Sequence, residues 1–553
     1  MQLPLSSARL DAFIFGRSAR GTNSAVLVEL KQWTEAKPSE WDDCVETFVG
    51  GSVRKMAHPS VQARAYAGYL RDAHSAFDAE QNGVFIAPCA WLHNMHPAAG
   101  EALRSRRFAA VLDEVPLYLN HDADTLAEYL ASHVGAGSGI PIMERVLSGK
   151  HAPSRRLLEH TAAMVRGEPR YRLLDDQIVA YNTVLGMVRR ATKDKRGKAV
   201  VVVRGGPGTG KSVIALNLLG TLSKSGFNAQ HATGSKAFTE NLWRVLGPRS
   251  KAQVRFFNNF GRAESDSIDV ILADEAHRIR STSNHRFTPK ALKSERAQID
   301  EIVDASKVAV FFIDDHQAVR PDEVGSTTLM RETAVRHNAR FESIDLRTQF
   351  RCAGSDEYID WIDQLLEIRK TGVAKFHGNP FTVEMFNTPI DLEARVLGLD
   401  RQGFGARIMA GYCWPWSEPD ADGQLLPDVQ IDEFRRPWNA KPDARRLAPG
   451  IPTAQFWASD PSGARQVGCV YTAQGFEFDY AGVIWGADLV VRDGKWVGQP
   501  SASRDHVVKT RSGARFTDVV KNAYRVLLTR GMRGVLICIL DAETRDYVAS
   551  RLR

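Results

Sequence analysis

The sequence predicts an α/β protein in which two tandem domains with parallel sheets follow a smaller α/β unit. A chain of 553 residues is longer than the roughly 250 to 300 residues at which a single hydrophobic core stops growing, so we expect about three units. Short, continuous apolar runs recur with helical segments between them, which is typical of strands buried on both faces of a parallel sheet. The runs of the first set are 199–205, 226–233, 269–275 and 308–315, and those of the second set are 406–412, 466–472, 480–487 and 534–540.

The N-terminal unit begins with two predicted strands within 8–31, separated by a turn that contains glycine. A helical pattern follows from Asp124 to Arg166, interrupted by the segment GAGSG at 135–139, which we expect to be flexible. We therefore divide the chain into a small α/β domain (1–120), a helical connector (121–170), a first domain with a parallel sheet (171–345) and a second such domain with insertions (346–553).

Composition excludes several classes of protein. The most apolar run, 199–203, is too short to span a bilayer, and the opening residues lack the basic and apolar regions of a signal peptide. The six cysteines are scattered, so neither a zinc site nor a disulfide framework is indicated. The net charge of +7 is compatible with a polyanionic partner without indicating one by itself. We expect a soluble, cytoplasmic protein without a membrane partner.

A phosphate-binding loop is predicted at 205–212, where GGPGTGKS fits the pattern GxxxxGK[ST] between an apolar strand and the helical segment VIALNLLGTL. Glycines let backbone N–H groups turn toward phosphates, Lys211 reaches the β- and γ-phosphates, and Ser212 can bind Mg²⁺. A Gly-rich turn that binds nothing is the alternative, and the agreement of motif and context disfavours it. The ATP-binding residues predicted here are Gly205, Gly206, Pro207, Gly208, Thr209, Gly210, Lys211 and Ser212.

Two consecutive carboxylates end the predicted strand 269–275, in the sequence IDVILADEAHR. Asp274 is predicted to hold the Mg²⁺ shell, and Glu275 to polarise the attacking water as a catalytic residue. A solvated strand end is the alternative, but the pair follows the phosphate-binding loop at the distance at which such carboxylates are found.

Further motifs occur in a fixed order around these two. They are LLDDQIVAYNTV, ATGSKAFTENL, FFIDDHQAVRP, LRTQFR, YTAQGFEFD and AYRVLLTRGMRG. In order and spacing the series resembles superfamily 1 helicases, and most closely the bacterial proteins whose ATPase module is related to the Schlafen group 3 DNA/RNA helicase domain. The resemblance covers roughly residues 171–545 and implies two tandem RecA-like P-loop domains.

The resemblance also implies roles around the nucleotide. Gln177 would read adenine, while Asp315 and Gln317 would sense the γ-phosphate. Arg351 and Arg530 would face the γ-phosphate from across a cleft as catalytic residues, with Arg533 as a reserve choice. An arginine placed there contributes roughly 10³ to 10⁵ in rate. A surface salt bridge is the alternative for each arginine.

The nucleic-acid contacts implied by the resemblance are Thr233, Ser235, Lys236, Thr472 and Gln474, with Gly475 and Glu477 in the motif that joins the groove to the ATP cleft. Trp414 and Trp416 could stack on bases, but buried packing of these aromatic rings is the favoured alternative. No accessory insertion of the size found in large unwinding enzymes is evident, so the sequence does not indicate processive unwinding.

The N-terminal unit carries a second candidate site. Asp11 on one strand and Glu29 and Lys31 on the next resemble the PD-(D/E)XK pattern of restriction-endonuclease-like folds. Alternation places Glu29 and Lys31 on one face of their strand. Asp11 and Glu29 would hold Mg²⁺ or Mn²⁺, and Lys31 would stabilise the scissile phosphate as a catalytic residue. Gln62 and Tyr66, one helical turn apart, resemble the following helix of RecB-like nucleases. A carboxylate on a preceding helix is missing, and a solvent-facing charge pair is the alternative.

These observations lead to one expected function and one alternative. We expect an ATP- and Mg²⁺-dependent DNA/RNA helicase-like motor or remodelling ATPase that acts on nucleic acid, coupled to metal-dependent cleavage by the N-terminal domain. The alternative is a nucleotide-dependent regulatory switch in which a degenerate nuclease fold serves as a docking module. The sequence leaves open whether DNA or RNA is bound.

Overall fold

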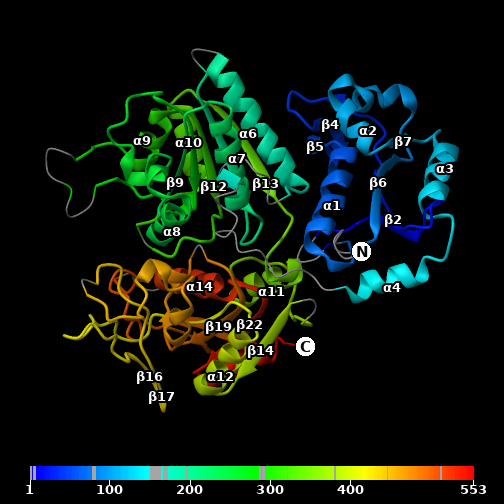
Figure 1. The fold of residues 1–553 in the computed structure, drawn as a ribbon. Helices are drawn as coiled ribbons and strands as arrows, with labels where there is room; N and C mark the ends of the chain where they lie inside the picture. The colour runs from blue at the N-terminus through cyan, green and yellow to red at the C-terminus, as the bar shows by residue number, and fades with distance from the viewer. Residues whose placement is uncertain are drawn as a thin grey trace.

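A computed structural model describes residue 3 and residues 8–77, 83–149, 164–165, 172–193, 197–284, 288, 293–320, 322–378, 381–444, 446–474, 476–510 and 514–552. Three units are visible in Figure 1: the N-terminal unit and the two domains of the predicted ATPase module. The first ATPase domain lies above the second, which contains the C-terminus.

The N-terminal unit is built on a four-stranded sheet of order β1-β2-β6-β7. Its strands are β1 (Ala12–Arg17), β2 (Asn23–Leu30), β6 (Phe85–Leu92) and β7 (Leu117–Leu119). β1 is antiparallel to β2, and the other neighbouring pairs are parallel. Helix α1 (Pro59–Ala73) packs on β2 and β6, and its first turn is capped by the side chain of His58. A separate three-stranded sheet consists of β3 (Lys37–Pro38), β4 (Cys44–Val49) and β5 (Ser52–Ala57), and a short helix α2 (Ala109–Glu114) precedes β7.

Most of the described part of the predicted connector belongs to this N-terminal unit, whereas Met164 and Val165 pack against the first ATPase domain. Helices α3 (Ala123–Val134) and α4 (Ile140–Ser148) pack against strands of its sheet. The segment 135–139, which we expected to be flexible, instead lies along β1: the Ala136 N–H donates to the Arg17 carbonyl (3.0 Å), and a Cβ at Gly139 would lie 2.0 Å from the Phe15 carbonyl oxygen. Small residues are needed here because two backbones approach closely. Residues 150–163 and 166–170 of the connector lie outside the described residues.

The first ATPase domain has a six-stranded sheet of order β10-β9-β11-β12-β8-β13, in which every neighbouring pair is parallel. Its strands are β8 (Ala199–Gly205), β9 (Ala229–Thr233), β10 (Val254–Phe256), β11 (Ile268–Asp274), β12 (Ser306–Ile313) and β13 (Arg340–Leu346). Its helices are α6 (Asp176–Lys193), α7 (Lys211–Lys224), α8 (Lys236–Leu246), α9 (Gln298–Ala305) and α10 (Thr327–Arg336). The central apolar strands are buried on both faces, as their sequences predict.

The second domain has a five-stranded parallel sheet of order β14-β22-β19-β15-β18. Its strands are β14 (Thr382–Phe386), β15 (Ala406–Ala410), β18 (Val467–Gly468), β19 (Phe478–Trp485) and β22 (Gly531–Ile539). Its helices are α11 (Asp356–Leu365), α12 (Pro389–Arg401), α13 (Val470–Ala473), α14 (Ala514–Leu528) and α15 (Ala542–Ala549). Two hairpins are added to it: β16 (Val429–Ile431) with β17 (Phe434–Arg436), and β20 (Leu489–Arg492) with β21 (Lys495–Gly498). The expected α/β fold with large parallel sheets is confirmed.

One predicted strand is largely wrong. Of 466–472, only Val467–Gly468 is extended, and the short helix α13 begins at Val470. The Thr472 hydroxyl accepts the Cys469 N–H (3.2 Å), a local side-chain bond that stabilises the turn of helix over the strand that the apolar, β-branched pattern favours.

The N-terminal unit and the first ATPase domain share hydrophobic cores. Trp41 and Cys44 of the N-terminal unit are fully buried in a cluster formed mainly by α6, α7 and β8. In the opposite direction, Leu174 and Ile178 of the ATPase module are buried in clusters of the N-terminal unit. Burying one large apolar side chain stabilises a fold by about 1.5 to 3 kcal/mol. The side chains that each unit buries in the core of the other therefore hold the two units together.

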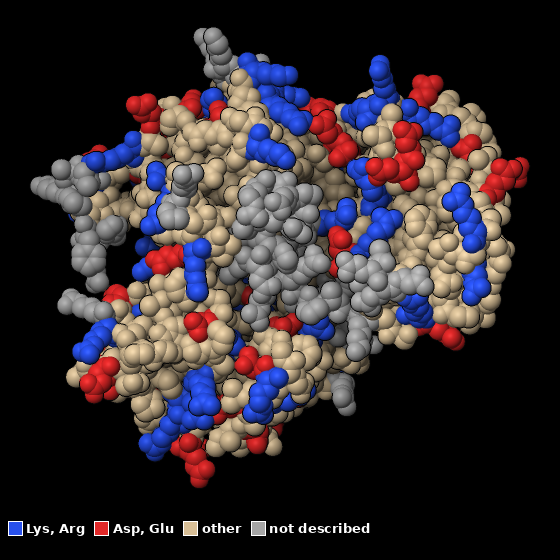
Figure 2. Space-filling view, in the orientation of Figure 1, with Lys and Arg blue, Asp and Glu red and all other residues tan. Residues whose placement is uncertain are grey.

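The surface carries charges of both signs. On the face shown in Figure 2, Lys and Arg alternate with Asp and Glu and do not form one continuous basic patch. Within the described ranges, no helix is long and apolar enough to cross a membrane.

Candidate nucleotide site and nucleic-acid groove

The phosphate-binding loop joins the end of β8 to the start of α7, as the motif predicts. Gly208 and Gly210 have positive φ angles of 80° and 83°, which L side chains rarely adopt. The ammonium group of Lys211 donates to the carbonyl oxygens of Gly205 and Gly206, both at 2.8 Å. The lysine is therefore held inside the loop, where a phosphate chain would lie.

Two carboxylates of the first domain are placed beside this lysine. Asp274 is 1% exposed at the end of β11; its Oδ1 accepts the Glu275 N–H (2.9 Å), and its Oδ2 is buried without a hydrogen-bond partner. Ser212 follows Lys211 in the first turn of α7. A free carboxylate oxygen and a hydroxyl are the ligands that Mg²⁺ prefers, so these residues fit the ion that accompanies ATP. Burial lowers the pKa of Lys211, while Asp314 and Glu275 act in the opposite direction.

Glu275 lies just beyond the strand in a left-handed conformation (φ 55°). Burial favours its neutral form, but the His277 ring, 3.1 Å from Oε2, and the charges of Arg278 and Arg530 together outweigh burial and lower the pKa of Glu275. Gln474 of the second domain lies 3.0 Å from His277 through its Nε2 and also contacts the backbone oxygen of Gln317. The carboxylate predicted to be catalytic is thus connected through one histidine to the other domain.

The two predicted arginines both face this cleft from the second domain. Arg351 pairs with Glu477, and Arg530 is 2% exposed with its Nε donating to the Val526 carbonyl (3.0 Å). Burial, together with repulsion from Arg351, lowers the pKa of Arg530 to about 9, and the carboxylate of Glu275 acts against this. Arg530 is therefore within electrostatic reach of Glu275, while Arg351 lies against Gly208 of the loop and acts on Lys211.

Two other predicted residues lie elsewhere. Arg533 pairs with Asp479 (3.3 Å) at the start of β19, so it is not a substitute for Arg530. Asp315, predicted to sense the γ-phosphate, instead caps α10 by accepting from the N–H and hydroxyl of Thr327 (2.9 and 2.7 Å). Of the two adjacent aspartates that end FFIDD, Asp314 faces the loop and Asp315 does not.

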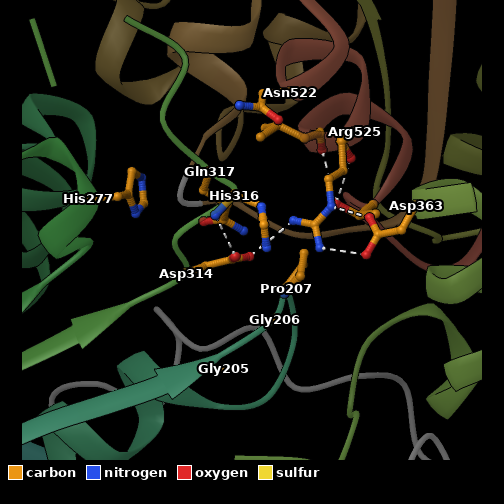
Figure 3. A network of polar contacts seen from close by, with 12 residues as sticks. Gly205, Gly206, Pro207, His277, Asp314, His316, Gln317, Asp363, Asn522 and Arg525 are labelled. Atoms are coloured by element: carbon orange, nitrogen blue, oxygen red, sulfur yellow. Dashed lines mark hydrogen bonds and ion pairs between the residues drawn. The ribbon is translucent and has the colours of Figure 1, made fainter. Parts of the chain in front are cut away.

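That first aspartate forms a buried ion cluster that the sequence analysis missed. Asp314 Oδ2 accepts from Arg525 Nη1 (3.1 Å), and Arg525 Nε donates to Asp363 Oδ1 (2.5 Å). The three side chains are at most 4% exposed, and they lie beside the phosphate-binding loop in Figure 3. Arg525 comes from α14 of the second domain, so the cluster joins the two ATPase domains at the nucleotide site. A single arginine within the apolar run AYRVLL was the available sequence signal.

Gln177, expected to read adenine, lies at the start of α6 against the loop. Its Nε2 donates to the Thr209 carbonyl (2.9 Å), and its Oε1 accepts the Leu174 N–H (3.0 Å). The amide group therefore lies against the phosphate-binding loop with both of its ends bonded to the backbone, and its contact with adenine stays a prediction.

A groove of about 740 Å³ opens between the two ATPase domains. It is lined by four of the five predicted nucleic-acid residues, namely Thr233, Ser235, Lys236 and Thr472. Basic and aromatic side chains from both domains line it as well, among them Arg278, Arg280, Arg320, Lys441, Phe256, Tyr412, Trp416 and Tyr471. Four acidic side chains, Glu240, Glu323, Glu418 and Asp443, line the groove too, and three of them pair with its basic residues. Basic side chains and aromatic faces are the features with which proteins bind single-stranded nucleic acid.

Three predictions at the groove need correction or limits. Gln474 is fully buried, because it bridges the domains instead of lining the groove. Trp414 and Trp416 pack against Trp438, and their indole N–H groups donate to backbone carbonyls (3.1 and 2.7 Å), as the packing alternative expects, although Trp416 also lines the groove. Gly475 lies outside the described residues.

The second candidate site is assembled in the N-terminal unit. Lys31 Nζ lies 2.6 Å from Glu29 Oε1, and Asp11 Oδ2 accepts the Leu30 N–H (2.9 Å). Glu29 is 2% exposed and its Oε2 has no partner, so the reading of a solvent-facing charge pair is wrong. Burial raises the pKa of Glu29 to about 7, although Lys31 acts against this. Among the described residues, no group of three or more His, Cys, Asp or Glu side chains is placed to hold a metal ion. A cation here would need backbone or water oxygens besides Asp11 and Glu29.

The sequence matches the family described as "Schlafen group 3, DNA/RNA helicase domain" over residues 198–541. The chain belongs to this family. The match covers both ATPase domains from β8 to the end of β22, and it includes the phosphate-binding loop, the carboxylates at the end of β11 and both facing arginines. The helicase-type resemblance is confirmed, while bacterial origin and a nuclease-like N-terminal domain remain predictions.

Among known proteins, this Schlafen-type chain is similar to an uncharacterised protein of Saccharomyces cerevisiae, with 25% identity over 408 residues that make up 64% of this chain and 84% of the yeast protein. Solved structures with similarity include a structure of two coordinating Pif1 helicases on forked double-stranded DNA (13% identity, TM-score 0.27, 65% of this chain and 92% of the other). Another is the Pif1 helicase of Candida albicans (11% identity, TM-score 0.28, 68% and 98%).

Proposed function

We propose that this Schlafen-type chain is an ATP-driven, helicase-like motor or remodelling ATPase that acts on a DNA or RNA strand in the groove between its two ATPase domains, in the cytoplasm. The observation that carries the proposal is the composition of the cleft. Lys211, Asp274 and Glu275 form one wall, and Arg351 and Arg530 face it from the other domain. Closure of such a cleft on a nucleotide would also change the groove, since both are formed between the same two domains.

The residues of the cleft have distinct proposed tasks. Ser212 and Asp274 would hold Mg²⁺, whose positive charge would balance that of the phosphates. Glu275, whose pKa is lowered by His277, Arg278 and Arg530, is a carboxylate that orients the attacking water and accepts its proton. Arg351 and Arg530 stabilise the negative charge that accumulates on the transferred phosphoryl oxygens.

Coupling to the groove is proposed to run through the His277 and Gln474 contact. This hydrogen bond connects the residue beside the catalytic carboxylate to the short segment after α13. Thr472, two residues before Gln474, lines the groove. A change at the γ-phosphate would thus reach a residue beside the bound strand through two side chains.

Arginine substitutions test this proposal with a matched control. Arg351→Ala and Arg530→Ala should each lower kcat for ATP hydrolysis by roughly 10³-fold with a much smaller change in KM. Arg533→Ala should keep wild-type kcat, because Arg533 pairs with Asp479 away from the cleft. Equal effects in all three variants would contradict the assignment of the cleft.

A metal-dependent nuclease in the N-terminal unit is a second proposed function, supported by the buried, unpaired oxygen of Glu29 beside Lys31. Glu29→Gln and Lys31→Ala should remove Mg²⁺- or Mn²⁺-dependent cleavage of DNA or RNA while ATP hydrolysis continues. The switch with a degenerate docking domain is the competing proposal, and absence of cleavage under all metal and nucleotide conditions would favour it.

A further inference from the structure

An aspartate of the ATPase module reaches into the N-terminal site. Asp175 precedes α6, and its Oδ1 accepts from both Gln62 Nε2 (2.8 Å) and the Tyr66 hydroxyl (2.6 Å) of α1. Gln62 and Tyr66 are also hydrogen-bonded to each other (2.9 Å). The two α1 residues predicted to belong to the N-terminal site are therefore held in place by a side chain from outside that domain.

The same aspartate lies within electrostatic reach of the Glu29 and Lys31 pair. Burial raises the pKa of Asp175, and Lys31 acts against this, just as Asp175 contributes to the raised pKa of Glu29. Glu29 Oε2 is buried and has no hydrogen-bond partner. The N-terminal site thus contains an unsatisfied acceptor next to a lysine, which is the chemistry that a phosphodiester with a divalent cation would complete.

Asp175 is also connected to the phosphate-binding loop along two short routes. Its Oδ2 accepts from the Thr348 hydroxyl (3.3 Å), and the two residues after Thr348 contact the loop: Gln349 Nε2 donates to the Pro207 carbonyl (2.5 Å), and the Phe350 N–H donates to the Gly208 carbonyl (2.8 Å). On the other side, Gln177, two residues after Asp175, donates to the Thr209 carbonyl.

These contacts leave the loop little freedom to move alone. Phosphate binding requires backbone N–H groups of the loop to face inward, and the peptide groups whose carbonyls are held by 349–350 cannot reorient without moving that segment. Asp175 itself has a positive φ of 46°, a conformation that a non-glycine residue keeps only where its surroundings fix it. Leu174 and Phe350 both pack in the core cluster around α1, which extends the connection into the N-terminal unit.

We propose that Asp175 is a positioning residue that the ATPase module contributes to the N-terminal phosphodiester site, and that nucleotide at the phosphate-binding loop changes this site through Asp175. The inference rests on the proposed binding of ATP and on the proposed nuclease site of the N-terminal unit, and it gives the two modules one shared residue. Movement of 348–350 or of Gln177 on nucleotide binding shifts Asp175. Because Gln62 and Tyr66 are hydrogen-bonded to Asp175, they then change position relative to Glu29 and Lys31.

Hydrogen–deuterium exchange on the full chain tests the inference without requiring cleavage. With Mg²⁺ and a non-hydrolysable ATP analogue, exchange should slow at 205–212 and should also change, by about fivefold or more, at 24–31 and 59–73. In Asp175→Asn, which tolerates the left-handed backbone, and in Tyr66→Phe, the loop should stay protected while the N-terminal change is lost.

The matched control is Asp72→Asn, which breaks an exposed ion pair with Arg172 (3.0 Å) at the same boundary without touching either route. It should behave like the wild-type protein. Protection of the loop with no change at 24–31 and 59–73 in the wild-type protein would overturn the inference, as would an N-terminal change that persists in Asp175→Asn and Tyr66→Phe. Lack of protection at 205–212 would instead overturn the proposed ATP site, and the inference with it.

Discussion

Replacing Arg525 with glutamine should destabilise the junction between the two ATPase domains by about 3 to 5 kcal/mol at neutral pH, the cost of removing one partner from a buried ion pair. The estimate applies because Arg525, Asp314 and Asp363 are all at most 4% exposed. Arg525→Lys should fall between the wild-type protein and Arg525→Gln, since an ammonium group cannot bridge two carboxylates as the planar guanidinium does.

The effect of Arg525→Gln should depend on pH with a definite sign. Burial favours the neutral form of Asp314, but Arg525 and Lys211 outweigh it and lower the pKa of that carboxyl group. A carboxylate with a lowered pKa contributes stability above its unfolded pKa of about 3.9, and this stability is lost as the pH falls through the folded value. The difference between wild-type protein and Arg525→Gln should therefore be largest near pH 7 and shrink below about pH 4.

Hydrogen-exchange protection of α14 and β12, measured at several pH values, reports the opening free energy of this junction. The matched control is Arg395→Gln, because Arg395 pairs with Glu384 (3.0 Å) on the surface of the same domain. That pair should contribute less than about 1 kcal/mol. The buried cluster does not hold the domains together if Arg525→Gln lowers the opening free energy no more than Arg395→Gln does. The same conclusion follows if the effect of Arg525→Gln does not shrink as the pH is lowered.

Three further predictions concern turnover, strand binding and cleavage. Glu275→Gln should bind a fluorescent ATP analogue like the wild-type protein but slow single-turnover hydrolysis by roughly 10²-fold or more; wild-type turnover would exclude Glu275 as the base. Lys236→Ala combined with Arg320→Ala should reduce the slope of log K against log salt for single-stranded nucleic acid by about 1 per lost phosphate contact, and an unchanged slope would place the strand elsewhere. Cleavage at a metal concentration below saturation should rise with pH around 7, because burial raises the pKa of Glu29 to about 7 and a cation must displace the proton of this carboxyl group; a flat profile below saturation would contradict this role.

Much of the fold could be predicted because its strands are continuous apolar runs. β8, β11, β12, β19 and β22 are all buried on both faces, and each was located within a few residues. β13 was missed because its sequence RFESIDL alternates apolar and polar residues and the strand lies at one edge of its sheet. The prediction of a strand at 466–472 was wrong for the opposite reason: the segment is apolar and β-branched, but a local side-chain hydrogen bond stabilises a helical turn there.

The candidate site was predictable where a motif fixes the residue. The phosphate-binding loop, Asp274, Glu275 and the two facing arginines carry such motifs. The choice between Asp314 and Asp315 could not be made from sequence, because it depends on which of two adjacent side chains turns toward Lys211 as the strand ends. Asp175 and Arg525 could not be predicted either, since their partners are far away in the chain: Tyr66 for one and Asp363 for the other.

Steady-state ATP hydrolysis by the full chain, with and without single-stranded DNA or RNA, tests the central claim most directly. We predict Mg²⁺-dependent hydrolysis that at least one nucleic acid stimulates at low salt, that loses its stimulation as salt rises because phosphate contacts release counterions, and that is absent in Lys211→Ala. Hydrolysis that survives in Lys211→Ala would contradict the nucleotide site, and hydrolysis that no DNA or RNA changes at low salt would contradict the motor and favour the nucleotide-dependent switch.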